Sequence, residues 1–220
     1  MLTTITLTAL AAAIRRVDAP ATRLVAVDGL GGAGKTVLAG ALAGELGAPV
    51  VEGDDFYRPS AERQPFASAP ESIGESFDWR RLEQQVLAPL SRGEQARYQR
   101  YDWDRDCLGD WVSVPSRDTV VVEGVYMLRS ELRGYASVSI WVETRRDLRL
   151  ARGIDRDGEA ARSRWTDEWM PAEDAYVSAM GPRRAAMLVV DGQGRPGLDP
   201  RHSVTILEAR PPFDGLVQEM

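Results

Sequence analysis

The chain contains 220 residues with a mass of 24.2 kDa, a length that suits one full α/β domain or two small ones. Apolar residues make up 44% and charged residues 27% of the sequence, which excludes disordered, collagen-like and coiled-coil proteins. The formal net charge of −6 argues against a nucleic acid or an anionic membrane as partner. With one cysteine (Cys107) and one histidine (His202), neither a disulfide within the chain nor a two-histidine zinc site can form.

The first twenty residues predict an amphipathic helix rather than a targeting segment. Apolar residues follow helical spacing from Ile5 to Ile14, and Pro20 ends the pattern. Arg15 and Arg16 follow the apolar stretch, whereas a secretory signal carries its positive charge in front. The sequence has no run of 18 uncharged apolar residues, so we expect a cytoplasmic protein without a membrane span.

Short apolar runs rich in β-branched residues alternate with helical segments along the chain. Such runs are typical of strands buried on both faces, and the alternation implies a parallel sheet with right-handed crossovers. The predicted strands are Leu24–Val27, Pro49–Val51, Thr119–Val122, Val138–Val142, Met187–Val190 and Val204–Leu207. The predicted helices are Lys35–Leu46, Trp79–Arg92, Arg145–Arg156 and about Glu168–Met180. We therefore predict one α/β domain over residues 1–220, in which the less regular stretches 53–77 and 95–115 are functional inserts.

The most specific motif follows the first predicted strand. The pattern G-x-x-x-x-G-K-[ST] of a phosphate-binding loop, or P-loop, is matched by Gly29, Leu30, Gly31, Gly32, Ala33, Gly34, Lys35 and Thr36. Glycines let the backbone N–H groups turn inward around an anion, next to the N-terminus of the following helix. Lys35, the only lysine in the chain, supplies a compact charge for the β- and γ-phosphates, and Thr36 offers a hydroxyl to Mg²⁺. The motif predicts that the protein binds a nucleoside triphosphate.

A missing residue type narrows the class of P-loop protein. Guanine-nucleotide switches recognise their base with an N-K-x-D motif, but this chain has no asparagine and no second lysine. ATPases, nucleotide-dependent synthetases and small-molecule kinases remain.

Acidic residues follow two of the predicted strands. Asp54 and Asp55 come shortly after the strand that ends at Val51, and Glu123 ends the strand that begins at Thr119. The carboxyl ends of parallel strands border the crevice in which such sheets bind ligands, so these carboxylates are expected beside the P-loop. Asp55 could instead cap a helix within an acidic turn.

From the stretch Asp54-Asp55-Phe56-Tyr57 onward, the sequence resembles the uridine kinase branch of P-loop kinases, which includes relatives that act on nicotinamide riboside and pantothenate. The resemblance covers about residues 22–192. It implies a P-loop fold that uses ATP and Mg²⁺ to phosphorylate a small-molecule hydroxyl, with a nucleoside as the first expectation. By this resemblance Asp54 is the base and Asp55 the reserve candidate, Thr36, Glu123 and Asp54 surround the metal, and Asp55 and Tyr57 border the acceptor within an insert at about 53–115.

Two further segments resemble acceptor-binding parts of this family. In Phe77-Asp78-Trp79, the resemblance gives Asp78 the role of binding the ribose diol, although Asp78 is also a good N-cap for the next helix. The segment Arg97–Trp103 is similar to the acceptor hairpin, where Tyr101 and Trp103 could stack on a flat base or pack the hairpin.

A stripe of arginines is similar to the lid helix of uridine kinases. Arg145, Arg149, Arg152 and Arg156 are spaced by four, three and four residues, which places them on one helical face. The resemblance implies a lid over about 152–168 in which Arg149 contacts nucleotide and Arg152 and Arg156 act on the transferred phosphoryl group. A solvated basic face is the alternative.

The acceptor is less specified than the donor. Uridine kinases carry a histidine after the Y-D pair of the hairpin, where this chain has Asp104-Arg105-Asp106. Pantothenate, nicotinamide riboside, a nucleoside monophosphate or a sugar are therefore alternative acceptors. An ATPase or ATP sensor that drives a partner, and a nucleotide-binding module without catalysis, are the alternatives of another class. Because relatives self-associate, a homodimer is a further expectation.

Overall fold

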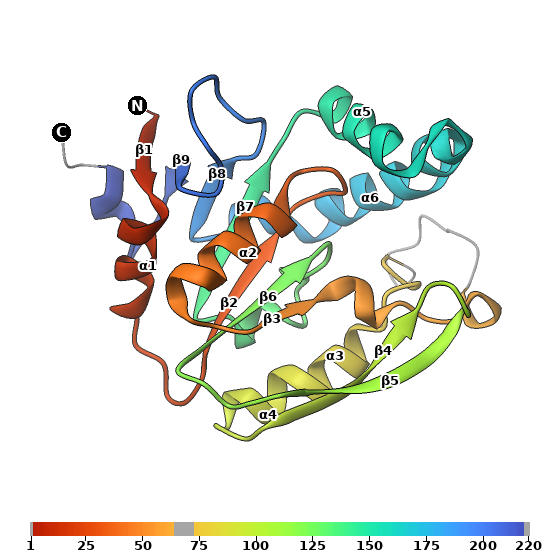
Figure 1. Ribbon diagram of the computed structural model, residues 1–220, viewed down its shortest axis with the longest axis horizontal. Helices are drawn as coiled ribbons and strands as arrows, with labels where there is room; N and C mark the ends of the chain where they lie inside the picture. The colour runs from red at the N-terminus through yellow and green to blue at the C-terminus, as the bar shows by residue number, and fades with distance from the viewer. Residues whose placement is uncertain (1, 64–72, 218–220) are drawn as a thin grey trace.

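The computed structural model describes residues 2–63 and 73–217 (Figure 1). They form a seven-stranded sheet of order β1-β9-β8-β7-β2-β6-β3 and a separate two-stranded hairpin, β4-β5. The five strands from β8 to β3 are parallel, whereas β9 and β1 are each antiparallel to their neighbours. The predicted α/β fold with a parallel central sheet is confirmed.

The predicted strands and most of the predicted helices correspond to observed elements with small shifts. The strands of the large sheet are β1 (Thr3–Thr6), β2 (Arg23–Asp28), β3 (Val50–Glu52), β6 (Thr119–Gly124), β7 (Val138–Glu143), β8 (Leu188–Asp191) and β9 (Ser203–Ala209). The hairpin consists of β4 (Ala96–Asp102) and β5 (Cys107–Val114). The helices are α1 (Leu7–Arg15), α2 (Lys35–Leu46), α3 (Trp79–Leu82), α4 (Ala88–Ser91), α5 (Arg146–Asp157), α6 (Met170–Met180) and α7 (Pro182–Ala185).

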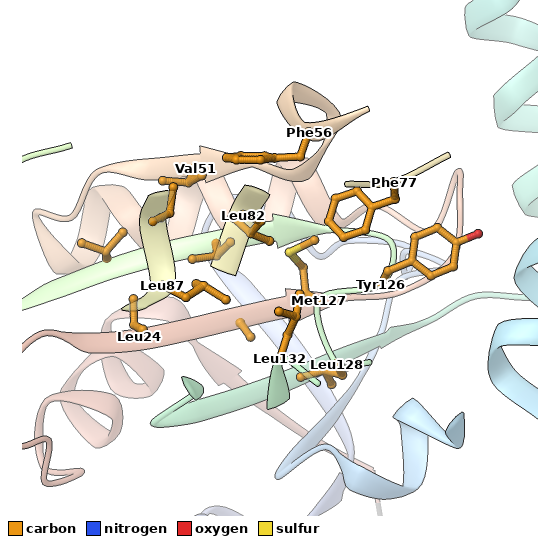
Figure 2. Packing of buried hydrophobic residues seen from close by; sticks show 14 of the residues in the cluster. Leu24, Val51, Phe56, Phe77, Leu82, Leu87, Tyr126, Met127, Leu128 and Leu132 are labelled. Atoms are coloured by element: carbon orange, nitrogen blue, oxygen red, sulfur yellow. The ribbon is translucent and has the colours of Figure 1, made fainter. Parts of the chain in front are cut away.

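Both faces of the sheet are covered by apolar side chains. Along β2, Leu24 and Ala26 belong to one core cluster, with residues of α3, α4 and α6, while Val25 and Val27 belong to the other, with α1 and α2. Figure 2 shows the first cluster, in which the Tyr126 hydroxyl points away from the aliphatic side chains. The continuous apolar runs therefore arise because successive residues of a strand point into two different cores.

The N-terminal segment differs from the prediction. Thr3–Thr6 form β1, in which Ile5 pairs with Val204 of β9, so the predicted amphipathic helix is confirmed only from Leu7 onward. Helix α1 begins at Leu7, where the Thr6 hydroxyl accepts the Ala9 N–H at 3.1 Å and ends the extended segment. The partner strand lies about 200 residues away in sequence, so local periodicity could not reveal the pairing.

Two other segments differ in detail. The predicted helix Trp79–Arg92 is interrupted by a π-helical turn at Glu83–Leu87, just before Pro89, which has no N–H to donate to the preceding turn. The strand predicted at Val204–Leu207 is antiparallel, as part of β9. Within the predicted acceptor insert, residues 64–72 lie outside the described residues, and 95–115 contain the hairpin β4-β5.

Candidate active site

Three adjacent parallel strands carry the predicted site residues to one edge of the sheet. Asp28 at the end of β2 is in register with Gly124 of β6, and Glu52 at the end of β3 is in register with Glu123. The P-loop therefore follows β2, Glu123 lies at the end of β6, and Asp54 follows β3. Figure 1 shows that α5 and the tip of the hairpin lie at this same end of the sheet. The predicted convergence of these residues at the carboxyl edge is confirmed.

The P-loop has the backbone conformation that an anion cradle needs. Gly34, with φ of 100°, precedes α2 without any side-chain cap on the helix, and the first turn contains no acidic residue. Gly32 has φ of 74°, and a Cβ atom there would lie 2.5 Å from the Arg149 carbonyl oxygen. The amides at the start of α2 are thus left for an anion, which the positive end of a helix favours.

Side chains bind the carbonyl groups of the P-loop. Lys35 Nζ donates to the Leu30 carbonyl at 3.1 Å, and Thr144 Oγ1 donates to the Ala33 carbonyl at 3.0 Å. Arg152 Nη1 donates to the Gly32 carbonyl at 3.2 Å. Lys35 is only 8% exposed, so its ammonium group is held in the loop and not in bulk solvent. These bonds fix the peptide planes of the loop before any ligand binds, which is pre-organisation for phosphate.

Asp28 anchors the base of the P-loop, and sequence reasoning missed it. Its carboxylate accepts the Gly29 N–H at 2.6 Å, the Leu128 N–H at 2.7 Å and the Tyr176 hydroxyl at 2.6 Å. Complete burial raises the pKa of Asp28 to about 6, although these hydrogen bonds and Lys35 oppose the shift.

We expect the Asp28→Asn variant to gain stability relative to the wild type as pH rises. Between about pH 4 and 6 the folded protein holds a proton on Asp28 that the unfolded chain has lost, so the wild type loses stability as pH rises through this range and levels off above pH 6. The difference in unfolding free energy between the two proteins should shift by about 2–3 kcal/mol from pH 4 to pH 7. Urea denaturation across this range measures it, and a constant difference would contradict the assignment.

Thr36 and Glu123 form the pair expected at a magnesium site. Thr36 Oγ1 donates to Glu123 Oε1 at 2.9 Å, and Glu123 is 6% exposed. Burial raises the pKa of Glu123, Lys35 and Thr36 oppose the shift, and the charge of Asp54 adds to it. Within 2–63 and 73–217, no group of three or more His, Cys, Asp or Glu residues is placed to hold a metal ion. A hydroxyl and one buried carboxylate nevertheless fit Mg²⁺, which keeps several waters and relies on substrate phosphates.

The two adjacent aspartates after β3 have different surroundings. Asp54 is exposed, and in the described part of the chain its carboxylate accepts no hydrogen bond and forms no ion pair. Asp55 is 7% exposed, and its carboxylate accepts the Tyr98 hydroxyl at 2.7 Å and pairs with Arg100 at 3.3 Å. Asp55 therefore fastens the hairpin to β3, which leaves Asp54 available to a substrate.

A buried ion pair connects α5 and α6 to the P-loop. Arg149 Nη1 contacts Glu173 Oε2 at 2.9 Å, and Glu173 Oε1 accepts the Gly31 N–H at 2.8 Å. Both residues are at most 5% exposed. The ring of Trp165 packs against Gly31 and would overlap a Cβ atom at Gly153, which explains why glycine stands in α5 there. Arg149, predicted to contact nucleotide, is thus bound to Glu173 in this structure. Sequence reasoning missed Glu173 and Trp165 because no local pattern marks them.

Removal of the Glu173 carboxylate should be costly, because it leaves the Arg149 guanidinium buried without its counter-charge. We expect Glu173→Ala to lower the free energy of unfolding by about 3–5 kcal/mol. The neighbouring Asp174 pairs with Arg146, but both side chains are about half exposed, so Asp174→Ala should cost less than about 1 kcal/mol. Chemical denaturation measures the unfolding free energy of both variants. Equal losses for Glu173→Ala and Asp174→Ala would show that the Glu173 pair does not hold α5 and α6 on the P-loop.

The remaining arginines of the predicted stripe have separate roles. Arg145 lies before α5, 71% exposed, and pairs with Asp147. Arg152 donates to the carbonyls of Gly192 at 2.8 Å and Gln193 at 2.9 Å, besides that of Gly32. Arg156 pairs with Asp157 at 2.7 Å, and the charge of Asp54 adds to the rise in its pKa caused first by Asp157. The charges of Arg156 and Asp54 therefore act on each other.

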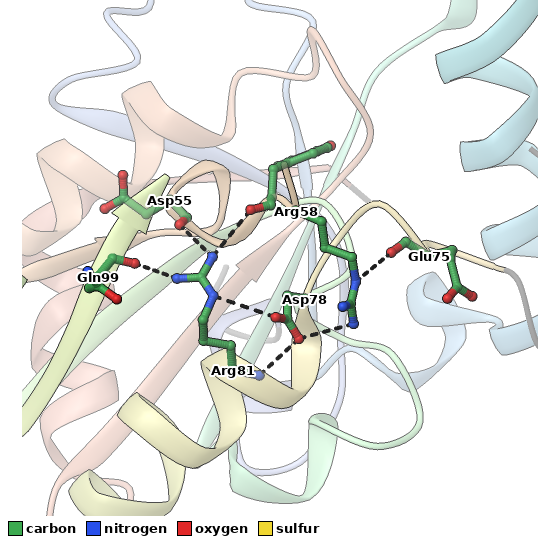
Figure 3. A network of polar contacts seen from close by, with 7 residues as sticks. Asp55, Arg58, Glu75, Asp78, Arg81 and Gln99 are labelled. Atoms are coloured by element: carbon green, nitrogen blue, oxygen red, sulfur yellow. Dashed lines mark hydrogen bonds and ion pairs between the residues drawn. The ribbon is translucent and has the colours of Figure 1, made fainter. Parts of the chain in front are cut away.

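Asp78 belongs to a polar network beneath the acceptor side (Figure 3). It accepts the Arg81 N–H at 3.2 Å as N-cap of α3, and its carboxylate pairs with Arg58 at 3.3 Å and with Arg81 at 3.6 Å. Arg81 in turn donates to the backbone carbonyls of Asp55 and Tyr57 and to that of Gln99. The capping interpretation of Asp78 is realised here, and the predicted ribose contact stays a prediction.

The predicted acceptor aromatics gather around a cation that sequence reasoning missed. The ring of Trp103 lies 5.0 Å from that of Tyr57 and 4.9 Å from that of Tyr101. The guanidinium carbon of Arg63 lies 5.2–5.6 Å from all three ring centres. Asp106, in the stretch that replaces the histidine of uridine kinases, accepts a hydrogen bond from the Tyr101 hydroxyl. We call Tyr57, Tyr101 and Trp103 the aromatic box.

A cavity of about 330 Å³ adjoins the C-terminal end of the P-loop. Its lining includes Gly34, Val37, Arg152, Gly192 and Leu198. Val37 and Leu198 are unusually exposed for apolar residues, at 47% and 37%. A cavity with apolar walls beside the phosphate cradle suits the nucleoside of a donor nucleotide. The glycine-rich stretch after β8 was the sequence signal that could have located it.

The sequence model of the phosphoribulokinase / uridine kinase family matches residues 24–177, most of the chain. The chain belongs to this family. The P-loop, Glu123, Asp54 and helix α5 all lie inside the matched region of this family. A comparison with proteins of curated function gives no match.

Two solved structures have the same architecture as this family member. One is a candidate fructose transport system kinase from Silicibacter sp. TM1040, with 27% identity, a TM-score of 0.66, and coverage of 80% of this chain and 96% of that one. The other is a candidate uridine kinase from Bacillus stearothermophilus, with 22% identity, a TM-score of 0.64, and coverage of 83% and 96%. Within residues 2–63 and 73–217, no helix is both long and apolar enough to cross a membrane.

Proposed function

We propose that the protein transfers the γ-phosphoryl group of ATP to a hydroxyl group of a small molecule. The observation that carries the proposal is the arrangement of Lys35, the Thr36–Glu123 pair and Asp54 after three neighbouring parallel strands. Phosphoryl transfer to an alcohol requires a phosphate cradle, a pair of groups for the metal ion and a carboxylate that can reach the acceptor. The P-loop, the Thr36–Glu123 pair and the exposed Asp54 are arranged for these roles. The cavity beside Gly34 supports a nucleotide as donor.

In this mechanism the residues position the reactants and stabilise charge. Lys35 and the inward amides of the P-loop hold the β- and γ-phosphates in line with the acceptor. Thr36 and Glu123 would hold Mg²⁺, which when bound neutralises phosphate charge. Asp54 orients the acceptor hydroxyl and takes its proton as the oxygen bonds to the γ-phosphorus and ADP leaves. Arg156, whose charge acts on Asp54, stabilises the negative charge that develops on the transferred phosphoryl group.

The acceptor predicted from the family resemblance is a nucleoside, and other small alcohols are the alternatives. A sugar is the alternative acceptor with the most support, because one similar structure is that of a candidate fructose transport system kinase. ADP release from ATP and Mg²⁺, measured against nucleosides, vitamins and sugars, tests the proposal. We expect acceptor-dependent release that Asp54→Asn abolishes. Steady hydrolysis that no acceptor stimulates would favour an ATPase instead.

A further inference from the structure

The aromatic box is occupied by part of the protein itself. The Arg63 guanidinium lies against the rings of Tyr57, Tyr101 and Trp103. The guanidinium occupies the ring faces turned toward Arg63, although Trp103 remains 51% exposed. The box therefore holds a cation as well as aromatic surface.

Hydrogen bonds hold this cation in place. Arg63 Nε donates to the Arg58 carbonyl at 2.7 Å, and Nη2 donates to the Tyr101 hydroxyl at 2.8 Å. The Tyr101 hydroxyl also donates to Asp106, whose carboxylate accepts the Ser60 N–H at 2.8 Å. The hairpin tip that lacks the histidine thus serves to fix the arginine.

Within the described residues, Arg63 differs from its basic neighbours in having no carboxylate in direct contact, while Asp106 is joined to it through the Tyr101 hydroxyl. Arg58 and Arg81 pair with Asp78, and Arg100 pairs with Asp55. Among residues 2–63 and 73–217, no carboxylate forms an ion pair with Arg63, which is half-buried. Nη1 of Arg63 has no hydrogen-bond partner within the same residues. A partly desolvated guanidinium with a free donor binds an anionic oxygen more strongly than a neutral one.

Tyr57 links the cation to the proposed base. Tyr57 lies three residues after Asp54 and contacts Arg63 through its ring. The charges of both groups reach the Tyr57 hydroxyl: burial raises its pKa most, Asp54 raises it further, and Arg63 lowers it. A small molecule beside Tyr57 would therefore meet a carboxylate and a cation at once.

We propose that the acceptor is an anionic alcohol, whose carboxylate or phosphate pairs with Arg63 while its hydroxyl faces Asp54. The inference rests on the proposed function and narrows its acceptor to one charge class. Arg63 would pair with the anionic group of the acceptor, at the end away from the reacting hydroxyl. The charge of Asp54 would therefore stay free to accept the hydroxyl proton.

Matched acceptors that differ in one anionic group test the inference. Suitable pairs are pantothenate with pantothenyl alcohol, and ribose 5-phosphate with ribose. Calorimetric titration measures binding of each member, and ADP release measures turnover. We expect an anionic member of at least one pair, carboxylate or phosphate, to bind at least about tenfold more tightly, which corresponds to about 1.4 kcal/mol.

Variants assign the preference to Arg63. Arg63→Gln should reduce the binding ratio of the favoured pair to near one, and Arg63→Lys should restore part of it because the charge returns. Arg97→Gln is the matched control, because Arg97 also lies over a ring, that of Trp111 at 4.7 Å, but is exposed on the hairpin. The inference is overturned if every anionic member binds no better than its neutral partner, or if Arg63→Gln keeps the ratio. Arg63-dependent binding without any ADP release would instead remove the proposed kinase function.

Discussion

Lys35→Ala should lower kcat/KM for acceptor phosphorylation by about 10²- to 10³-fold, the cost of removing one pre-organised charge from a transferred phosphoryl group. The chain has no second lysine that could replace it. In the structure the ammonium already lies in the loop on the Leu30 carbonyl, so it needs only a short movement to reach a phosphate. Acceptor-dependent ADP release measures the loss.

Lys35→Arg provides the matched control for charge. A planar guanidinium keeps the charge but presents a wider fork than the ammonium, so we expect this variant to recover little activity. Thermal unfolding of both variants should stay close to that of the wild type, because Lys35 makes one hydrogen bond to the backbone. Turnover of Lys35→Ala within tenfold of the wild type would remove the P-loop from the mechanism.

Asp54→Asn should mainly lower activity and Asp55→Asn should mainly lower stability, although the two residues are adjacent. Asn at position 54 cannot accept a proton, so we expect kcat to fall by about 10²- to 10⁴-fold. The unfolding free energy of the Asp54→Asn protein should change by less than about 0.5 kcal/mol, because Asp54 is exposed.

Asp55→Asn should instead destabilise the fold. The buried carboxylate accepts the Tyr98 hydroxyl and pairs with Arg100, so its replacement should cost about 1–3 kcal/mol. Kinetics at saturating ATP and urea denaturation on the same samples separate the two roles. If Asp55→Asn is inactive but fully stable and Asp54→Asn is active, Asp55 and not Asp54 is the base.

Features encoded within short stretches of sequence were predicted well. The strand β2, the P-loop and α2 follow one another within 24 residues, and α2 has the predicted bounds Lys35–Leu46. The apolar runs located the sheet strands to within a residue or two, because burial on both faces leaves a continuous apolar signal. Strand β1 escaped prediction because its pairing with β9 joins the two ends of the chain.

The arginine stripe shows where local pattern stops being informative. Helical spacing correctly placed Arg149, Arg152 and Arg156 on α5. The partner of each guanidinium depends on which element packs against it, however. Arg149 contacts Glu173 of α6, and Arg152 contacts backbone carbonyls of two loops. Spacing fixes the side of a helix on which residues lie, and tertiary packing fixes what they meet there.

The sequence by itself determined the nucleotide-binding half of this protein. Lys35 and its glycines work through local backbone geometry, which a few consecutive residues can specify. Only the tertiary structure separated Asp54 from Asp55, joined Glu173 to the P-loop and placed Arg63 in the aromatic box. Each of these results depends on contacts between segments far apart in the chain, and the identity of a side chain does not reveal which distant group will satisfy its charge or hydrogen bonds.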